Sequence, residues 1–176
     1  MNFTSPLFRS AVFLVILSVI PGCGYTRKSV LPEGIKTIHV DTVKNKIPMD
    51  HLSVYVPGLE ISITNAIIKR MNRDGNLRVV SKNDSDAVLE SELISMDQEG
   101  VRFTNLESVE EYRLYLVLAM RLRNTKTGEV IWEEPNFSGD AEYFVSGVRS
   151  IAREEAAQRA VDRLAHNVVD RIVEDW

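Results

Sequence analysis

Residues 112–123, with the sequence YRLYLVLAMRLR, contain the clearest secondary-structure signal of the chain. Every second side chain is large and apolar: Tyr112, Leu114, Leu116, Leu118, Met120 and Leu122. The positions between them hold Arg113, Tyr115, Val117, Ala119, Arg121 and Arg123. A period of two residues is typical of a β-strand with one buried face. The stretch therefore predicts a strand whose even-numbered residues share one face.

The flanking segments indicate further strands. Residues 124–128 (NTKTG) predict a turn, and β-branched and aromatic residues at 129–133 predict a hairpin partner. Alternating apolar and acidic residues predict a strand from Ala87 until Gly100 interrupts it, and shorter strands are expected at 35–43 and 77–80. Residues 44–57 predict a loop, whereas the aromatic and polar segment from Pro135 to Gly147 indicates neither helix nor strand.

Two segments have helical periodicity. Leu59, Ile63, Ile67 and Met71 recur every four residues, and Gly75 is suited to the C-terminal cap of that helix. From Ile151 to Val173, pairs of apolar residues predict a long second helix, with Ser150 as its N-cap. We expect the inner stripe of this helix to contain Val161, Leu164, Val168 and Ile172.

The order of these elements, β-α-β-β-β-β-α, predicts an α+β fold. We expect a mostly antiparallel sheet of four to five strands, with two helices packed on one face.

The N-terminus predicts export and lipid attachment. Arg9 precedes an apolar run at residues 11–20, which ends in Ile20-Pro21-Gly22-Cys23, a sequence that resembles a bacterial lipobox. The run is about half of the ~20 residues that a transmembrane helix needs. We expect residues 1–22 to be a lipoprotein signal peptide that is removed, 23–34 to be the lipidated Cys23 with a short tether, and 35–176 to be a single domain. An ordinary signal peptide with a coincidental cysteine is the alternative.

Composition argues against several function classes. Residues 1–22 contain Arg9 as their one charged residue, so their removal takes the net charge from −4 to −5, and no Lys/Arg-rich block occurs; nucleic acid is thus not an expected partner. Cys23 is the one cysteine, so its lipidation leaves no thiol for a disulfide or a nucleophile. His39, His51 and His166 are scattered and have no catalytic motif around them. We therefore expect no enzyme activity, no cofactor and no metal.

Short motifs along the chain resemble the lipopolysaccharide-assembly lipoprotein (LptE) family. They are Cys23-Gly24-Tyr25, Leu31-Pro32 before Ile35-Lys36-Thr37-Ile38-His39-Val40, Val43-Lys44-Asn45-Lys46, Arg78-Val79-Val80, Ser85-Asp86-Ala87-Val88-Leu89 and Thr127-Gly128-Glu129-Val130-Ile131-Trp132. The first helix at 59–71 and the long C-terminal helix extend the resemblance over nearly the whole chain after residue 22.

The resemblance implies a non-enzymatic lipoprotein of the outer membrane, held on its periplasmic side by a lipid anchor. Such a protein plugs the LptD β-barrel, helps that barrel to assemble and supports lipopolysaccharide transport to the outer leaflet. The same motifs also resemble lipoproteins of the curli-secretion and penicillin-binding-protein-activator type. A tether of about ten residues reaches only roughly 15–20 Å, which is short for an activator of a peptidoglycan synthase.

Three basic residues are candidates for lipopolysaccharide contact. Arg121 and Arg123 lie on the exposed face of the predicted strand, and Lys126 lies in the following turn. A guanidinium binds phosphate with two parallel hydrogen bonds, so this cluster predicts a site for the phosphates of lipid A. Solvated strand residues or contacts to the barrel lumen are the alternative interpretation.

Overall fold

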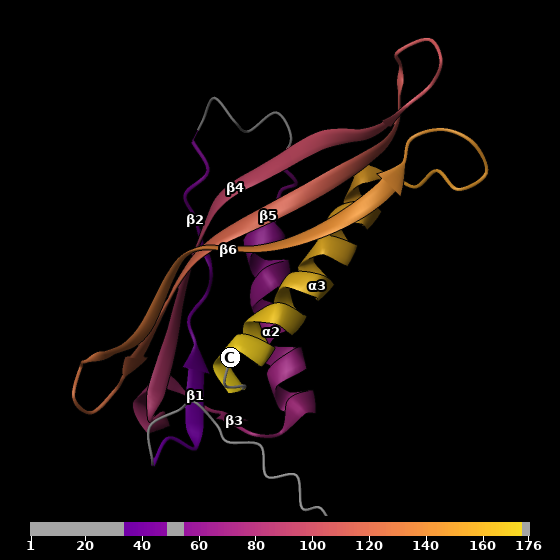
Figure 1. Ribbon diagram of the computed structural model, residues 1–176. Helices are drawn as coiled ribbons and strands as arrows, with labels where there is room; N and C mark the ends of the chain where they lie inside the picture. Colours follow the sequence, from indigo (N-terminus) through magenta and orange to yellow (C-terminus); the bar gives the residue numbers. More distant parts are fainter. Residues whose placement is uncertain (1–33, 49–54, 174–176) are drawn as a thin grey trace, which may run out of the picture.

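The computed structural model describes residues 34–48 and 55–173, which form one sheet with two long helices on one of its faces (Figure 1). The predicted signal peptide, Cys23 and the tether up to residue 33 lie outside the described residues. The elements in chain order are β1 (Thr37–Val40), β2 (Lys44–Asn45), α2 (Leu59–Asp74), β3 (Arg78–Val79), the short 3-10 turn η2 (Lys82–Asp84), β4 (Ala87–Phe103), β5 (Val109–Asn124), β6 (Val130–Phe144) and α3 (Arg153–Val173).

The α+β fold with two helices on one face of the sheet is confirmed. Most of the strand pairing is antiparallel, as predicted, but the sheet is mixed rather than purely antiparallel and has six strands instead of four to five. Its strand order is β3-β1-β4-β5-β6, and β2 pairs with β4 beside β1. The three long strands β4, β5 and β6 are antiparallel, whereas β1 runs parallel to both β3 and β4, and β2 runs parallel to β4. The parallel pairing of β1 with β3 follows from the crossover through α2, which returns the chain to the same end of the sheet.

Several strand boundaries differ from those predicted. The strand that starts at Ala87 does not stop at Gly100, because register shifts between Gly100 and Phe103 let it continue to Phe103. Part of the expected loop at 44–57 forms β2, which contributes two residues to the sheet. The segment after Pro135 belongs to β6, where the register passes from Glu134 to Phe137 opposite Met120 and Leu118. An edge strand tolerates a proline there, because a bulge needs no ladder N–H from it.

The core lies between the helices and the even-numbered face of β5. The six even-numbered side chains singled out in the sequence are at least half-buried, and Leu114, Leu116, Leu118 and Leu122 have no exposed surface. The predicted stripe of α3 is confirmed, since Val161, Leu164, Val168 and Ile172 are all fully buried. Gly75 ends α2 in a left-handed conformation (φ 80°), as expected of a C-terminal cap.

The predicted N-cap of the last helix is wrong. Helix α3 begins at Arg153, and the backbone N–H of Ala156 donates to the carbonyl of Ala152. The Ser150 hydroxyl instead donates to the Gly147 carbonyl, and Ile151 N–H donates to the carbonyl of Phe144. Ser150 and Ile151 therefore lie beside Phe144 at the end of β6, and the helix begins two residues after Ile151. Within the described ranges, neither helix is both long and apolar enough to cross a membrane.

Candidate functional site

The face of the sheet opposite the helices is strongly acidic. Cross-strand register places three arginines on it (Arg113, Arg121 and Arg123) together with seven carboxylates (Glu90, Glu92, Asp97, Glu99, Glu133, Asp140 and Glu142). These ten side chains sum to −4, and Asp140 at the β6 edge also lies 3.6 Å from Arg163 of α3. We call this surface the open face.

The three predicted lipopolysaccharide-contacting residues lie near one another, and each has a carboxylate partner. Arg121 Nη2 lies 2.7 Å from Glu133 Oε1, and Arg123 Nη2 lies 3.3 Å from Glu90 Oε2. Lys126 Nζ lies 2.7 Å from Asp86 Oδ1. The contact with Glu133 raises the pKa of the Arg121 guanidinium, and Arg121 in turn lowers the pKa of Glu133. Lipopolysaccharide binding by this cluster stays a prediction, and it would require a phosphate to compete with these carboxylates.

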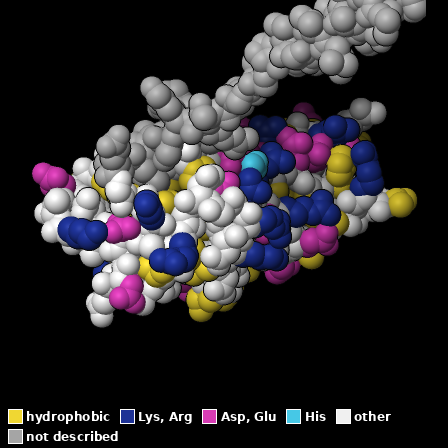
Figure 2. Space-filling model, turned by 90° about the horizontal axis from the view of Figure 1, so that it is seen from below, with side chains coloured by type: hydrophobic (Ala, Val, Ile, Leu, Met, Phe, Trp, Pro, Cys, Tyr) yellow, Lys and Arg dark blue, Asp and Glu magenta, His cyan; other side chains and the backbone are white. Residues whose placement is uncertain are grey.

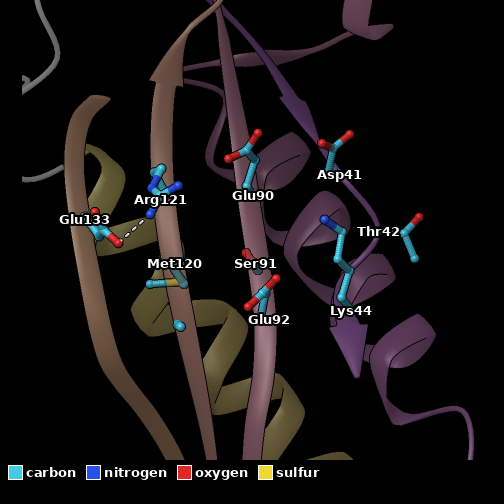
Figure 3. Close-up of a pocket in the computed structure, with 10 residues that line it drawn as sticks. Asp41, Thr42, Lys44, Glu90, Ser91, Glu92, Met120, Arg121 and Glu133 are labelled. Atoms are coloured by element: carbon cyan, nitrogen blue, oxygen red, sulfur yellow. Dashed lines mark hydrogen bonds and ion pairs between the residues drawn. The ribbon is translucent and has the colours of Figure 1, made fainter. Parts of the chain in front are cut away.

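An open hollow of about 260 Å³ lies beside Arg121 on the open face. Figure 3 shows Arg121 joined to Glu133. Glu90 and Glu92 line the hollow from the neighbouring strand β4, and Asp41 and Lys44 line it from the segment beyond β4. Four of the six charged side chains that line the hollow are therefore acidic. This surplus of negative charge opposes an anion such as a phosphate.

Asp86 is a structural partner of Lys126 rather than part of a ligand site. Its Oδ2 accepts hydrogen bonds from the backbone N–H groups of Lys36 and Thr37 and from the Thr37 hydroxyl. The Lys126 ammonium, followed by these donors, holds the pKa of the Asp86 carboxyl well below its usual range. Asp86 thereby connects the start of β1 and the start of β4 to the turn between β5 and β6.

A second candidate surface, which the sequence did not reveal, is an apolar tip at the end of the long β4–β5 hairpin. Five large apolar side chains are exposed there, on the hairpin and on the nearby loop between β6 and α3: Val101, Phe103, Leu106, Val145 and Val148. Leu106 is 87% exposed, and Val148 is fully exposed. Val145 N–H donates to the Glu110 carbonyl, so the loop is attached to the base of the hairpin. Figure 1 shows both loops at the same end of the molecule.

Two arginines converge at this apolar tip. The guanidinium carbons of Arg102 and Arg149 lie 5.4 and 4.2 Å from the centroid of the same ring, that of Phe144. Arg102 Nε also lies 3.1 Å from Glu111. No carboxylate among the described residues forms an ion pair with Arg149. Glu107 and Glu110 belong to the same hairpin, so the tip carries acids as well. It combines exposed apolar side chains with an arginine that has no carboxylate partner among the described residues, which suits an amphiphile that carries both acyl chains and negative charge.

The helix layer offers a third, more balanced surface. Figure 2 shows Lys and Arg side chains gathered in the right-hand half of the view from below, with Asp and Glu between them. A hollow of about 230 Å³ between α2 and α3 is lined by Lys69, Arg70, Arg73, Asp162 and His166, with two alanines. Asp170 lies 3.5 Å from Arg70 and 3.2 Å from His166. Three cations thus face two carboxylates at this hollow, so it is far less acidic than the open face.

The described histidines lie in separate elements of the fold. His39, on β1, contacts the Val80 carbonyl and the carboxylate of Asp41, whereas His166 lies on α3 and contacts Asp170; His51 is outside the described residues. No group of three His, Cys, Asp or Glu side chains in the described part of the chain has the geometry to hold a metal ion.

Known proteins with this architecture include two solved structures. The hypothetical protein CT253 from Chlamydia trachomatis is 12% identical, and the match covers 78% of this chain and 95% of that chain with a TM-score of 0.51. Protein XCC0632 from Xanthomonas campestris is 12% identical over 82% of this chain and 90% of that chain, also with a TM-score of 0.51. Such low identity shows a shared fold alone. The rare lipoprotein B from Shewanella oneidensis gives a looser match, with 16% identity, 76% and 89% coverage and a TM-score of 0.43.

Family membership rests on the sequence. None of the curated proteins matches the chain. The model of the lipopolysaccharide-assembly family, LptE, matches residues 35–175, which include all the helices and strands described above. The chain therefore belongs to the lipopolysaccharide-assembly (LptE) family.

Proposed function

We propose that this protein is a non-enzymatic, lipid-anchored protein on the periplasmic side of the outer membrane. In this proposal it plugs an LptD-type β-barrel, assists the assembly of that barrel and supports lipopolysaccharide transport to the outer leaflet. The family match over residues 35–175 is the observation that carries the proposal. It also favours this function over the curli-secretion and penicillin-binding-protein-activator alternative.

The length of the sheet supports a plug that reaches across the membrane. Strand β1, which follows the predicted tether, and the loop between β4 and β5 lie at opposite ends of the molecule (Figure 1). Strand β4 has 17 residues, which span about 55 Å at roughly 3.3 Å per residue. The hydrocarbon core of a bilayer is about 30 Å thick. A domain that stands in a barrel lumen, with Cys23 anchored in the periplasmic leaflet, would carry its tip to the level of the outer leaflet.

We propose that the apolar tip, rather than the open face, makes the direct contact with lipopolysaccharide. Leu106 and Val148 can bury their exposed surface against acyl chains, which is worth about 1.5–3 kcal/mol for each side chain that is fully buried. Arg149 forms no ion pair with a carboxylate of the described residues, so it can bind a phosphate without breaking such a pair. On the open face, by contrast, the phosphate would meet Glu90, Glu92 and Glu133.

One binding experiment separates the two candidate contacts. Lipopolysaccharide binding is measured for the purified full chain, for a tip variant (Leu106→Ser, Val148→Ser and Arg149→Ser) and for an open-face variant (Arg121→Ser, Arg123→Ser and Lys126→Ser). We expect the tip variant to bind at least about tenfold more weakly and the open-face variant to keep its affinity. Loss of binding in the open-face variant alone, with its thermal unfolding unchanged, would instead assign the contact to Arg121, Arg123 and Lys126.

The cellular function is tested by depletion. Without the protein, the level of folded LptD-type barrel should fall, and the outer membrane should admit bulky hydrophobic compounds. Wild-type chain should restore both properties. Normal barrel levels together with an intact permeability barrier would contradict the proposal.

A further inference from the structure

The two long edges of the sheet differ in how well their backbone groups are protected. At the β6 edge, Pro135 lies in a bulge, Asn167 of α3 donates to the Ser138 carbonyl, and Ile151 N–H donates to the Phe144 carbonyl. A proline, a bulge and a covering helix are devices by which proteins block an edge strand. The β6 edge is therefore poorly suited to accept another strand.

The distal half of β4 has no such protection from the described residues. On the side away from β5, β4 pairs with β1 at Ala87–Leu89 and with β2 at Glu92 and Leu93, and Lys46 N–H donates to the Leu93 carbonyl. From Ser95 to Phe103, the register pairs β4 with β5 alone. This second half of the strand, which we call the distal β4 edge, presents backbone donors and acceptors to an additional strand.

The side chains along the distal β4 edge specify the chemistry of such a strand. Asp97 and Glu99 are exposed on the open face, opposite Tyr115 and Arg113. Arg113 is hydrogen-bonded to Glu142 on the other side and lies 3.8 Å from Asp140, so it does not neutralise Glu99. No cation of the described residues forms an ion pair with Asp97 or Glu99. Farther along, Val101 and Phe103 are 38% and 58% exposed.

We propose that an extended segment of a partner protein, with basic residues at alternate positions and apolar residues toward one end, adds to the sheet as a strand along the distal β4 edge. Main-chain hydrogen bonds would hold this segment, and its Lys or Arg side chains would lie opposite Asp97 and Glu99. Its apolar end would cover Val101 and Phe103. Val101 and Phe103 also belong to the apolar tip, but the inference does not depend on the proposed lipopolysaccharide contact, because it rests on the unpaired backbone of Ser95 to Phe103 and on a different ligand class.

Charge argues against a second copy of this chain as the occupant. A two-fold antiparallel pairing centred on Gln98 would place Asp97 of one copy opposite Glu99 of the other, in both halves of the interface. Like charges directly opposite one another destabilise a pair of strands. An anionic lipid surface is opposed by the same two carboxylates.

The test uses the full chain and a nine-residue peptide of alternating lysine and valine as the probe. Hydrogen exchange should show that the peptide protects backbone amides within residues 95–103. A peptide of alternating glutamate and valine should leave them unprotected. The variant Asp97→Lys/Glu99→Lys should bind the lysine peptide at least about tenfold more weakly.

A matched variant controls for net charge. Glu129→Lys/Glu155→Lys makes the same change of total charge at two exposed positions away from β4, and it should bind the lysine peptide within about threefold of wild type. Equal weakening in both variants, protection that maps to β6, or no binding at millimolar peptide would overturn the proposal. A dimer in sedimentation analysis that Asp97→Lys/Glu99→Lys abolishes would assign the edge to a second copy and would also overturn it.

Discussion

Gly139→Ala is expected to destabilise the fold because α3 touches the backbone of β6 at this glycine. A Cβ atom built on Gly139 would lie 2.6 Å from Leu164 Cβ and 2.7 Å from both the Leu164 backbone nitrogen and its Cα. Carbon atoms in contact are normally 3.5–4.0 Å apart. The helix would therefore have to move away from the sheet by roughly 1 Å at a position where Leu164 has no exposed surface.

The magnitude follows from two opposing effects. Replacing glycine by alanine usually stabilises a protein by about 0.4–1 kcal/mol where the backbone permits it, and Gly139 has no positive φ that would forbid it. Forcing extra volume into a packed core typically costs about 1–3 kcal/mol. Since the contact is made with backbone atoms that no rotamer change can remove, the second effect should dominate. We expect a net loss of about 1–2 kcal/mol, or a melting temperature lower by roughly 2–8 °C for a chain of this size.

The assay is reversible denaturant unfolding of the full chain, with Ser138→Ala as the control. Ser138 is the preceding residue of β6 and is exposed on the opposite face, so its replacement should change stability by less than about 0.5 kcal/mol. Trimming the neighbouring side chain gives a second check, because Leu164→Ala removes none of the three clashing atoms and should not rescue Gly139→Ala. A neutral or stabilising Gly139→Ala, or a rescue by Leu164→Ala, would show that the helix does not approach the strand this closely.

Three further predictions concern the core, the pH dependence and the anchor. Leu164→Ala alone should cost about 2–5 kcal/mol in the same unfolding assay, because Leu164 is fully buried; a loss below about 0.5 kcal/mol would contradict that burial. Asp86 has a depressed pKa, so its contribution to stability should be complete above the ordinary carboxyl pKa of about 4 and should be lost as the pH falls toward its lowered value. Asp86→Asn should therefore lower the melting temperature at pH 7 and make the melting temperature fall less steeply as the pH is lowered. If the melting temperature of the variant fell with pH as steeply as that of the wild type, Asp86 would not be a source of the acid sensitivity. Cys23→Ala should leave an unlipidated, unprocessed precursor, and an unchanged N-terminal mass with full membrane attachment would refute lipidation at Cys23.

The elements with a strict period could be predicted from the sequence, whereas those that depend on a neighbour could not. The alternation from Tyr112 to Arg123 assigned these side chains of β5 to their correct faces, and the paired apolar residues of α3 gave its buried stripe. β2 and the second half of β6 were missed. β2 is a strand only because β4 lies beside it, and β6 continues past Pro135 only because it is an edge strand with a bulge there.

The candidate sites show the same limit. Alternation placed Arg121 and Arg123 on the open face, but it could not show that Glu133 and Glu90 lie opposite them, because that depends on the register set by the turn and the bulge. The apolar tip was missed because exposure of Leu106 and Val148 is a tertiary property. One local signal was available, since Val148 and Arg149 follow a glycine in a turn-rich segment, where an apolar side chain has no core to enter.

The distribution of charge decides which of these surfaces suits lipopolysaccharide. On the open face, seven carboxylates of β4 and β6 outnumber three arginines, and each arginine is paired with a carboxylate of a neighbouring strand, so the arginines stabilise the sheet and offer little attraction to a phosphate. An anionic amphiphile that approaches the open face is repelled by this excess of carboxylates. At the apolar tip, Arg149 has no carboxylate partner among the described residues, and Leu106 and Val148 offer apolar surface beside it. A phosphate and an acyl chain can thus be bound together at the tip, whereas on the open face the phosphate would have to displace a carboxylate and the acyl chain would find few exposed apolar side chains.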